Sequence, residues 1–252
     1  MLNSTLNKYP NICKLITEKD IKKWENLSNK YKAFLEEYVY KVNFNILTIL
    51  VASTLNYEPA MNLLTFLEDS LKIFPELINS KEFKKNIKSL EEFSFLSFLS
   101  ELSVARRYKS KGYDIKFNFK YKKFLKNEVR DKDVDLEVAD NNGNKIYIDV
   151  YTPYKRTDIN GPGDLSIIED KFRNQLVNKQ YDKFFGLAPN QLNGKKILEV
   201  NCAYHDDSLI SLALTGGQYD IKGIVGVQLF HHDIASSNES QMIKYIPLEN
   251  YL

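Results

Sequence analysis

Two short runs of alternating residues, joined by a turn, constrain the fold of this chain more than any other feature. In residues 133–138 apolar residues alternate with acidic ones, and residues 146–151 alternate in a similar way. A period of two is typical of strands that bury one face. The intervening Asp140-Asn-Asn-Gly-Asn144 favours a turn, because Gly143 can adopt a positive φ. The sequence therefore predicts an antiparallel hairpin centred on Asn142.

The register of this hairpin brings two carboxylates together. Asp135 and Asp149 are equidistant from Asn142, so we expect them side by side on one face of the sheet. Like charges on opposed residues are destabilising unless something neutralises them. Mg²⁺ (or Mn²⁺) would do so, held by both carboxylates with the Val150 carbonyl as a further ligand. The alternative is a solvated outer face, where acidic residues are common.

A third acidic residue comes from a helix expected at 91–111, which Gly112 would end. Apolar residues recur along it at helical spacing, and Glu101 borders this apolar stripe. A carboxylate at the margin of a packed face needs a partner or a metal ion. Glu101 is therefore a candidate to orient a water molecule or a second metal ion. The alternative is an edge position paired with Arg106 or Arg107.

The chain as a whole divides into two parts of different pattern. Residues 1–90 carry apolar residues at helical spacing and predict an all-helical domain. Residues 91–252 predict a helix, three strands, a second helix at 166–185, and later strands at 197–202 and 223–230. The fold class expected for this second domain is α/β, with a central mixed β-sheet flanked by helices.

The order of these parts resembles the PD-(D/E)xK nuclease superfamily, whose fold is restriction-endonuclease-like. The likeness covers about residues 91–230, with Glu101 on the opening helix, Asp135 in the second strand and Asp149 near the end of the third. It implies that these acids bind Mg²⁺ and that a lysine after the last of them stabilises the transition state of phosphodiester hydrolysis. This chain departs from the pattern, because Tyr151 stands where the family has lysine.

Two lysines are candidates for the missing positive charge. Lys155 follows the third strand, and Lys171 lies on the next predicted helix, where Gln175 and Lys179 continue its stripe. A tyrosine hydroxyl can donate a hydrogen bond, but it brings no positive charge to a phosphate. Without a lysine at the acids, the same fold would be a catalytically inactive module.

A basic cluster with interleaved aromatic residues lies between the first two predicted strands. Its members Lys122, Lys123 and Lys126, together with Gln175 and Lys179, are the residues expected to contact nucleic acid. The alternative is a solvated loop in a lysine-rich protein. The net charge of +2, from 35 basic and 33 acidic residues, argues neither for nor against such a partner.

The cysteines and the apolar segments indicate the setting of the chain. Cys13 and Cys202 are far apart, which excludes a disulfide framework and favours a reduced, cytoplasmic location. The first residues lack a signal-peptide pattern, and the longest apolar run, at 44–55, is shorter than the ~20 residues that span a bilayer, so no membrane contact is expected.

The function that these features favour is a metal-dependent nuclease acting on nucleic acid, with DNA preferred to RNA. The helical domain would then serve targeting or oligomerisation, for example as a homodimer. Two alternatives stay open. An inactive nuclease fold would bind nucleic acid or a protein partner, and a structural protein would use its helical half and carry the acidic hairpin only as surface.

Overall fold

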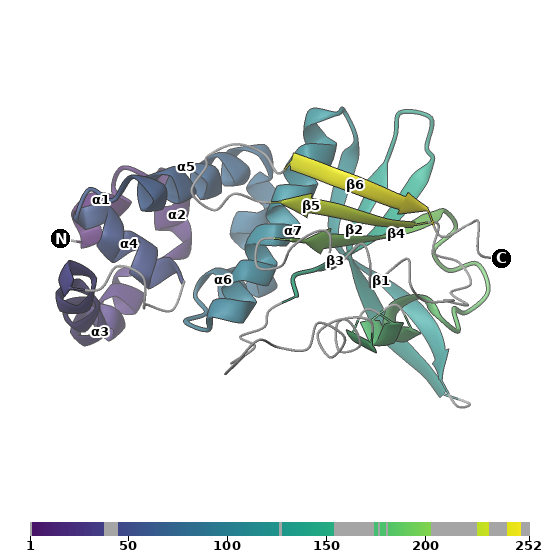
Figure 1. Ribbon diagram of the computed structural model, residues 1–252, viewed down its shortest axis with the longest axis horizontal. Helices are drawn as coiled ribbons and strands as arrows, with labels where there is room; N and C mark the ends of the chain where they lie inside the picture. Colours follow the sequence, from purple (N-terminus) through teal and green to yellow (C-terminus); the bar gives the residue numbers. More distant parts are fainter. Residues whose placement is uncertain are drawn as a thin grey trace, which may run out of the picture. The chain divides into compact units, whose positions relative to one another are not determined.

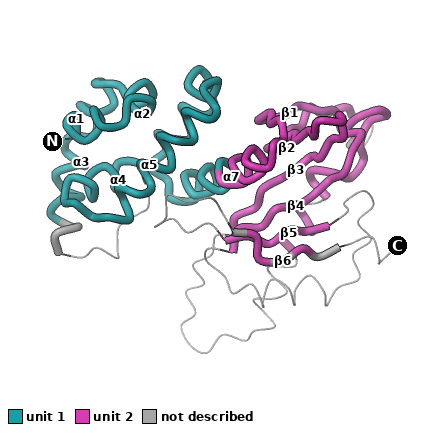
Figure 2. The backbone as a smooth tube through the Cα atoms, turned by 90° about the horizontal axis from the view of Figure 1, so that it is seen from above, with its two compact units in different colours: residues 1–102, 233–239 teal, residues 103–232, 240–252 magenta. Residues whose placement is uncertain are grey.

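The described residues form two compact units, which Figure 2 distinguishes by colour. One unit spans residues 1–102, and every described residue from Ser103 onward belongs to the other. The units divide inside helix α7 (Glu92–Ser110), beyond the boundary that the sequence predicts near residue 90. The computed structural model describes residues 2–37, 45–125, 128–153, 174–175, 177–179, 181–202, 226–231 and 241–247.

The first unit is helical, as predicted. Asn45 begins α4 by accepting a hydrogen bond from the Thr48 N–H at 3.1 Å, and Pro59 stands in the first turn of α5. Buried Glu68 accepts hydrogen bonds from the N–H groups of Asn11 and Ile12 at the start of α2. No described helix is both long and apolar enough to cross a membrane. The elements are α1 (Leu2–Leu6), α2 (Pro10–Leu15), α3 (Glu18–Glu37), α4 (Ile46–Thr54), α5 (Glu58–Ile73), the 3₁₀ turn η1 (Pro75–Asn79) and α6 (Lys81–Ile87).

The second unit contains a six-stranded mixed sheet, whose strands are labelled in Figure 1 and lie side by side in chain order in Figure 2. The first three strands are antiparallel, β3, β4 and β5 are parallel, and β5 and β6 are antiparallel. The α/β class is therefore confirmed. The strands are β1 (Asp114–Leu125), β2 (Glu128–Ala139), β3 (Lys145–Tyr151), β4 (Lys195–Asn201), β5 (Gly226–His231) and β6 (Gln241–Pro247).

Two parts of the sheet differ from the prediction. The basic segment expected as a loop is instead strand, because β1 and β2 continue as a long hairpin to the pair Leu125 and Glu128. The edge strand β6 was not predicted. Its Met242, Ile243 and Tyr245 are all exposed, so the strand lacks the alternation of a half-buried element.

A buried ion pair joins the end of α7 to the sheet. Arg107 lies 2.7 Å from a carboxylate oxygen of Glu199 on β4, and the Tyr108 hydroxyl donates a hydrogen bond of 3.1 Å to the other oxygen. Burial raises the pKa of Glu199, against the opposing effect of Arg107. This contact explains why the last turns of α7 belong to the second unit.

We expect Arg107→Met to lower the free energy of unfolding by about 3 to 5 kcal/mol, because it leaves Glu199 charged and buried without its cation. The double variant Arg107→Met, Glu199→Leu should lose less than either single variant, because it removes both charges together. Urea denaturation of the three variants measures this. Additive losses in the double variant would contradict the interpretation.

Candidate active site

The hairpin that carries the two predicted carboxylates is confirmed. The pairs between β2 and β3 run from Ala139 and Lys145 to Leu136 and Ile148, so the register is centred on Asn142. Local hydrogen bonds stabilise the turn, since Asp140 accepts hydrogen bonds from backbone N–H groups at 142 and 144, at 2.9 and 2.8 Å.

Asp149 is the most buried member of the site. Its side chain has no exposed surface, yet it lies against two ammonium groups from the helical residues 177–179 and 181–184. Lys179 Nζ is 3.2 Å from one carboxylate oxygen of Asp149, and Lys183 Nζ is 3.1 Å from the other. Asp149 is thus a buried anion that is neutralised by two cations.

Asp135 reaches toward the same place from β2. Its carboxylate accepts a hydrogen bond of 2.6 Å from the backbone N–H of Val150, so it crosses to the strand that carries Asp149. On its other side β1 is irregular: the register passes over Asn118, whose φ of 51° is left-handed. Asparagine tolerates this conformation better than most residues. The irregular position in β1 therefore lies opposite Asp135, whose side chain bonds to the backbone of β3.

The charges of the site act on each other strongly. Burial lowers the pKa of Lys183, but Asp149 and Asp135 outweigh this effect and raise the pKa above its ordinary value. Lys183 also donates a hydrogen bond of 3.0 Å to the backbone carbonyl of Asp133. Lys183 is therefore held as a cation between β2 and β3, whose acids it neutralises.

Tyr151, the last residue of β3, also contacts helical residues. Its hydroxyl donates a hydrogen bond of 2.6 Å to the side-chain oxygen of Gln175, and its ring centroid is 5.1 Å from Lys179 Nζ. Burial raises the pKa of Tyr151 to about 12, so the hydroxyl keeps its proton at neutral pH. Tyr151 thus brings Lys179 to the acids instead of supplying a cation itself.

The other predicted site residues have different outcomes. Lys155, Lys171 and Lys126 lie outside the described residues, so their predicted roles stay predictions. Glu101 is half-buried on the part of α7 that belongs to the first unit, and its role also stays a prediction.

The predicted nucleic-acid contacts need one correction. Lys122 is exposed on β1, as such a contact requires. Lys123 is buried instead, and its ammonium donates hydrogen bonds to the backbone carbonyls of Tyr181 and Asp182. Its charge stabilises the packing of the 181–187 segment against β1 and does not face solvent, because strand alternation turns Lys123 inward where a loop would have left it free.

Lys183 is the member of the ionic cluster that the sequence interpretation missed. The stripe at 171, 175 and 179 has an interval of four, and one more step reaches 183. Residues four apart lie on one face of a helix, so the stripe could have been extended to Lys183.

The oxygen atoms present suit a hard divalent cation. The carboxylates of Asp135 and Asp149 and the carbonyl of Val150 are the donors that Mg²⁺ prefers, and such ions commonly keep several waters. Among the described residues, no three His, Cys, Asp or Glu side chains group together to hold a metal. An ion here would therefore have few protein ligands, and the ammonium groups of Lys179 and Lys183 already lie against the oxygens of Asp149.

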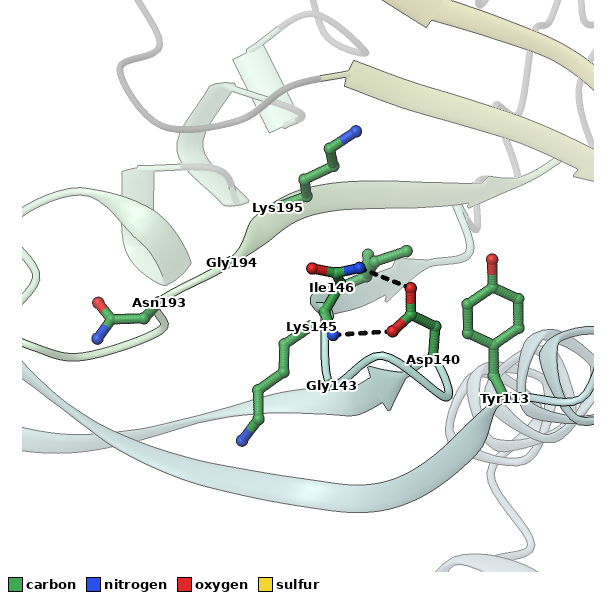
Figure 3. Close-up of a pocket in the computed structure, with 9 residues that line it drawn as sticks. Tyr113, Asp140, Gly143, Lys145, Ile146, Asn193, Gly194 and Lys195 are labelled. Carbon is green, nitrogen blue, oxygen red and sulfur yellow. Dashed lines mark hydrogen bonds between the residues drawn. The ribbon is translucent and has the colours of Figure 1, made fainter.

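A cavity of about 600 Å³ lies elsewhere, at the beginning of β3 and β4 (Figure 3). The β2–β3 turn and Tyr113 line it, and Asp140 is turned back onto Asn144 by the hydrogen bonds drawn in Figure 3. Asp149 stands near the other end of β3. The cavity brings no pair of carboxylates together, so the ionic cluster of Asp135, Asp149, Lys179 and Lys183 is the stronger candidate for chemistry.

Comparison with known proteins gives one remote likeness. No protein-family model and no curated protein matches the chain. Among solved structures, it is similar to a chain of the "CdiA-CT/CdiI toxin and immunity complex from Burkholderia pseudomallei", at 20% sequence identity. The match covers 61% of this chain and 89% of that chain with a TM-score of 0.33, so the functional argument rests on the site's own geometry.

Proposed function

We propose that the chain is a metal-dependent nuclease of the PD-(D/E)xK kind, in which the lysine has moved from β3 to the helical residues 177–179 and 181–184. One observation carries this proposal. Two ammonium groups, those of Lys179 and Lys183, lie within 3.2 Å of the carboxylate of Asp149. Acids and a lysine amine within a few ångströms of each other are what phosphodiester hydrolysis requires of this fold.

Each residue of the cluster has a separate role in this proposal. Asp135 and Asp149, with the Val150 carbonyl, would hold Mg²⁺ or Mn²⁺. When bound, the ion would supply polarisation of the phosphodiester and a lower pKa for a water molecule. Lys183, whose side chain is 16% exposed, fixes Asp149 in place. Lys179, at 26% exposure, is the more accessible amine and carries the positive charge to the phosphate.

Nucleic acid is the proposed substrate, with DNA tested first. Exposed Lys122 on β1 offers a phosphate contact outside the cluster. Gln175 also has an exposed side chain and is held by Tyr151, so it can reach a bound strand from the edge of the site.

The test is cleavage of single- and double-stranded DNA and RNA by the purified chain, in Mg²⁺, in Mn²⁺ and in EDTA. We expect cleavage that requires the metal and falls by a factor on the order of 10³ in Asp135→Asn, because one of two charged ligands is lost. The matched control is Asp131→Asn, an exposed acid on the same strand.

The outcome that contradicts the proposal is equally concrete. If the wild-type chain cleaves none of the four substrates in any metal, and Tyr151→Lys restores no cleavage, the nuclease proposal fails. The inactive module would then be favoured. Its specific support is that the two lysines already neutralise Asp149, so the folded cluster needs no metal ion for its stability.

A further inference from the structure

We infer that the ammonium group of Lys179 is a tethered competitor of the metal ion, which must leave its position before the ion can bind. The inference rests on the proposed function and adds to it an order of events. The Lys179 side chain first occupies the metal ligands. The ion then displaces it, and the displaced ammonium contacts the phosphate.

The contacts of Lys179 are those that the ion would make. Its Nζ donates a hydrogen bond of 2.9 Å to the carbonyl oxygen of Val150 and lies 3.2 Å from Asp149 Oδ2. Both atoms belong to the proposed ligand set. A hard divalent cation binds such oxygens at 2.0–2.6 Å, so a bound ion would bring a second cation against the same two oxygen atoms. Repulsion between the ion and the ammonium therefore makes their occupation of these atoms competitive.

Lys183 differs from Lys179 in the atoms that it contacts. It pairs with the other carboxylate oxygen of Asp149 and donates to the carbonyl of Asp133, which is outside the ligand set. Its side chain is also the more buried of the two, at 16% exposure against 26%. Lys183 can therefore stay in place beside a bound ion, whereas Lys179 blocks the ligands and has the more open route to solvent.

The neighbours of Lys179 make its position specific. The Tyr151 ring lies 5.1 Å from the ammonium, and the Tyr151 hydroxyl is fixed on Gln175, four residues before Lys179. The cation–π contact with Lys179 and the hydrogen bond to Gln175 connect Tyr151 to two residues on one helical face. When displaced from Val150, the ammonium can stay over the ring, next to the ligands and ready for a phosphate.

The test is calorimetric titration with Mn²⁺ in the absence of nucleic acid. We expect Lys179→Met to bind Mn²⁺ about tenfold more tightly than wild type, because the competing cation is gone. Lys179→Gln is a second variant with the same expectation. Lys179→Arg keeps the charge and should show no gain, and Lys85→Met, an exposed lysine on α6, should bind as wild type does.

A second comparison distinguishes the effect of a lysine that occupies the metal ligands from the effect of its positive charge alone. Lys183→Met removes the same charge from Asp149 but does not free the Val150 carbonyl, so its gain should be smaller than that of Lys179→Met. An equal or larger gain would overturn the inference, as would unchanged, weaker or absent Mn²⁺ binding in both uncharged variants at position 179. Thermal unfolding of each variant verifies that it is folded.

Failure of the inference and failure of the proposed function have different signatures. Tighter Mn²⁺ binding by the variants without any cleavage would support competition between Lys179 and the ion but contradict the nuclease proposal. Metal-dependent cleavage with unchanged Mn²⁺ affinity in Lys179→Met and Lys179→Gln would support the nuclease proposal but contradict competition between Lys179 and the ion.

Discussion

Asp149→Asn is expected to abolish cleavage and to destabilise the protein at the same time. Cleavage should fall by a factor on the order of 10³, because the ion loses a charged ligand. The free energy of unfolding should fall by about 3 kcal/mol, because Lys179 and Lys183 then lack the buried anion that they share. Urea denaturation and a cleavage assay at matched folded concentration measure the two effects separately.

Asp135→Asn provides the comparison that makes this prediction sharp. Cleavage should fall as far, but the free energy of unfolding should fall less than in Asp149→Asn. The asparagine side-chain oxygen can still accept the hydrogen bond from the Val150 N–H. Asp114→Asn is the surface control, since that side chain is 88% exposed, and it should change neither property. Equal stability of Asp149→Asn and Asp114→Asn would contradict the role of Asp149 as a shared anion.

Lys179→Met should reduce cleavage by about 10² to 10³ while leaving the fold intact, because a positive group aimed at the developing phosphate charge is lost. Its expected signature is unusual: the rate falls although Mn²⁺ binds more tightly. A residue needed only for packing would lower both. Lys179→Arg should recover part of the rate, since the charge is retained in a different geometry.

The assay for this variant is single-turnover cleavage at saturating Mn²⁺. Saturation removes the difference in metal affinity and leaves the effect on the chemical step. A rate equal to that of wild type would assign the phosphate contact to another cation, and Lys171, which lies on the predicted stripe, would be the next residue to replace.

Local features of the sequence predict one half of the site well. The turn around Gly143 and the alternation on either side of it determine the register, and the register places Asp135 and Asp149 on neighbouring strands. These relations depend on residues less than twenty apart, where strand periodicity and turn geometry are strong constraints. The helical first unit was predictable for the same reason.

The cationic half of the site depends on packing between distant segments. Periodicity places Lys179 and Lys183 on one stripe, but it does not say which strand the stripe meets. Burial of Lys123 was mispredicted because the length of the β1–β2 hairpin depends on pairing, and the segment is too rich in lysine to suggest it. The sequence of edge strand β6 lacks an alternation of apolar and polar residues, so periodicity did not predict this strand.

The sequential order of the strands has a consequence for how the ionic cluster assembles during synthesis of the chain. The hairpin with both carboxylates is complete at Tyr151, whereas the lysines at 179 and 183 come later and β4 begins only at Lys195. Chains emerge from the ribosome amino terminus first, and parallel pairing with a crossover is slower than hairpin closure. A partly made chain that stops before residue 179 should therefore have the acidic strands without Lys179 and Lys183, so that the ionic cluster forms only after the later segment has been made.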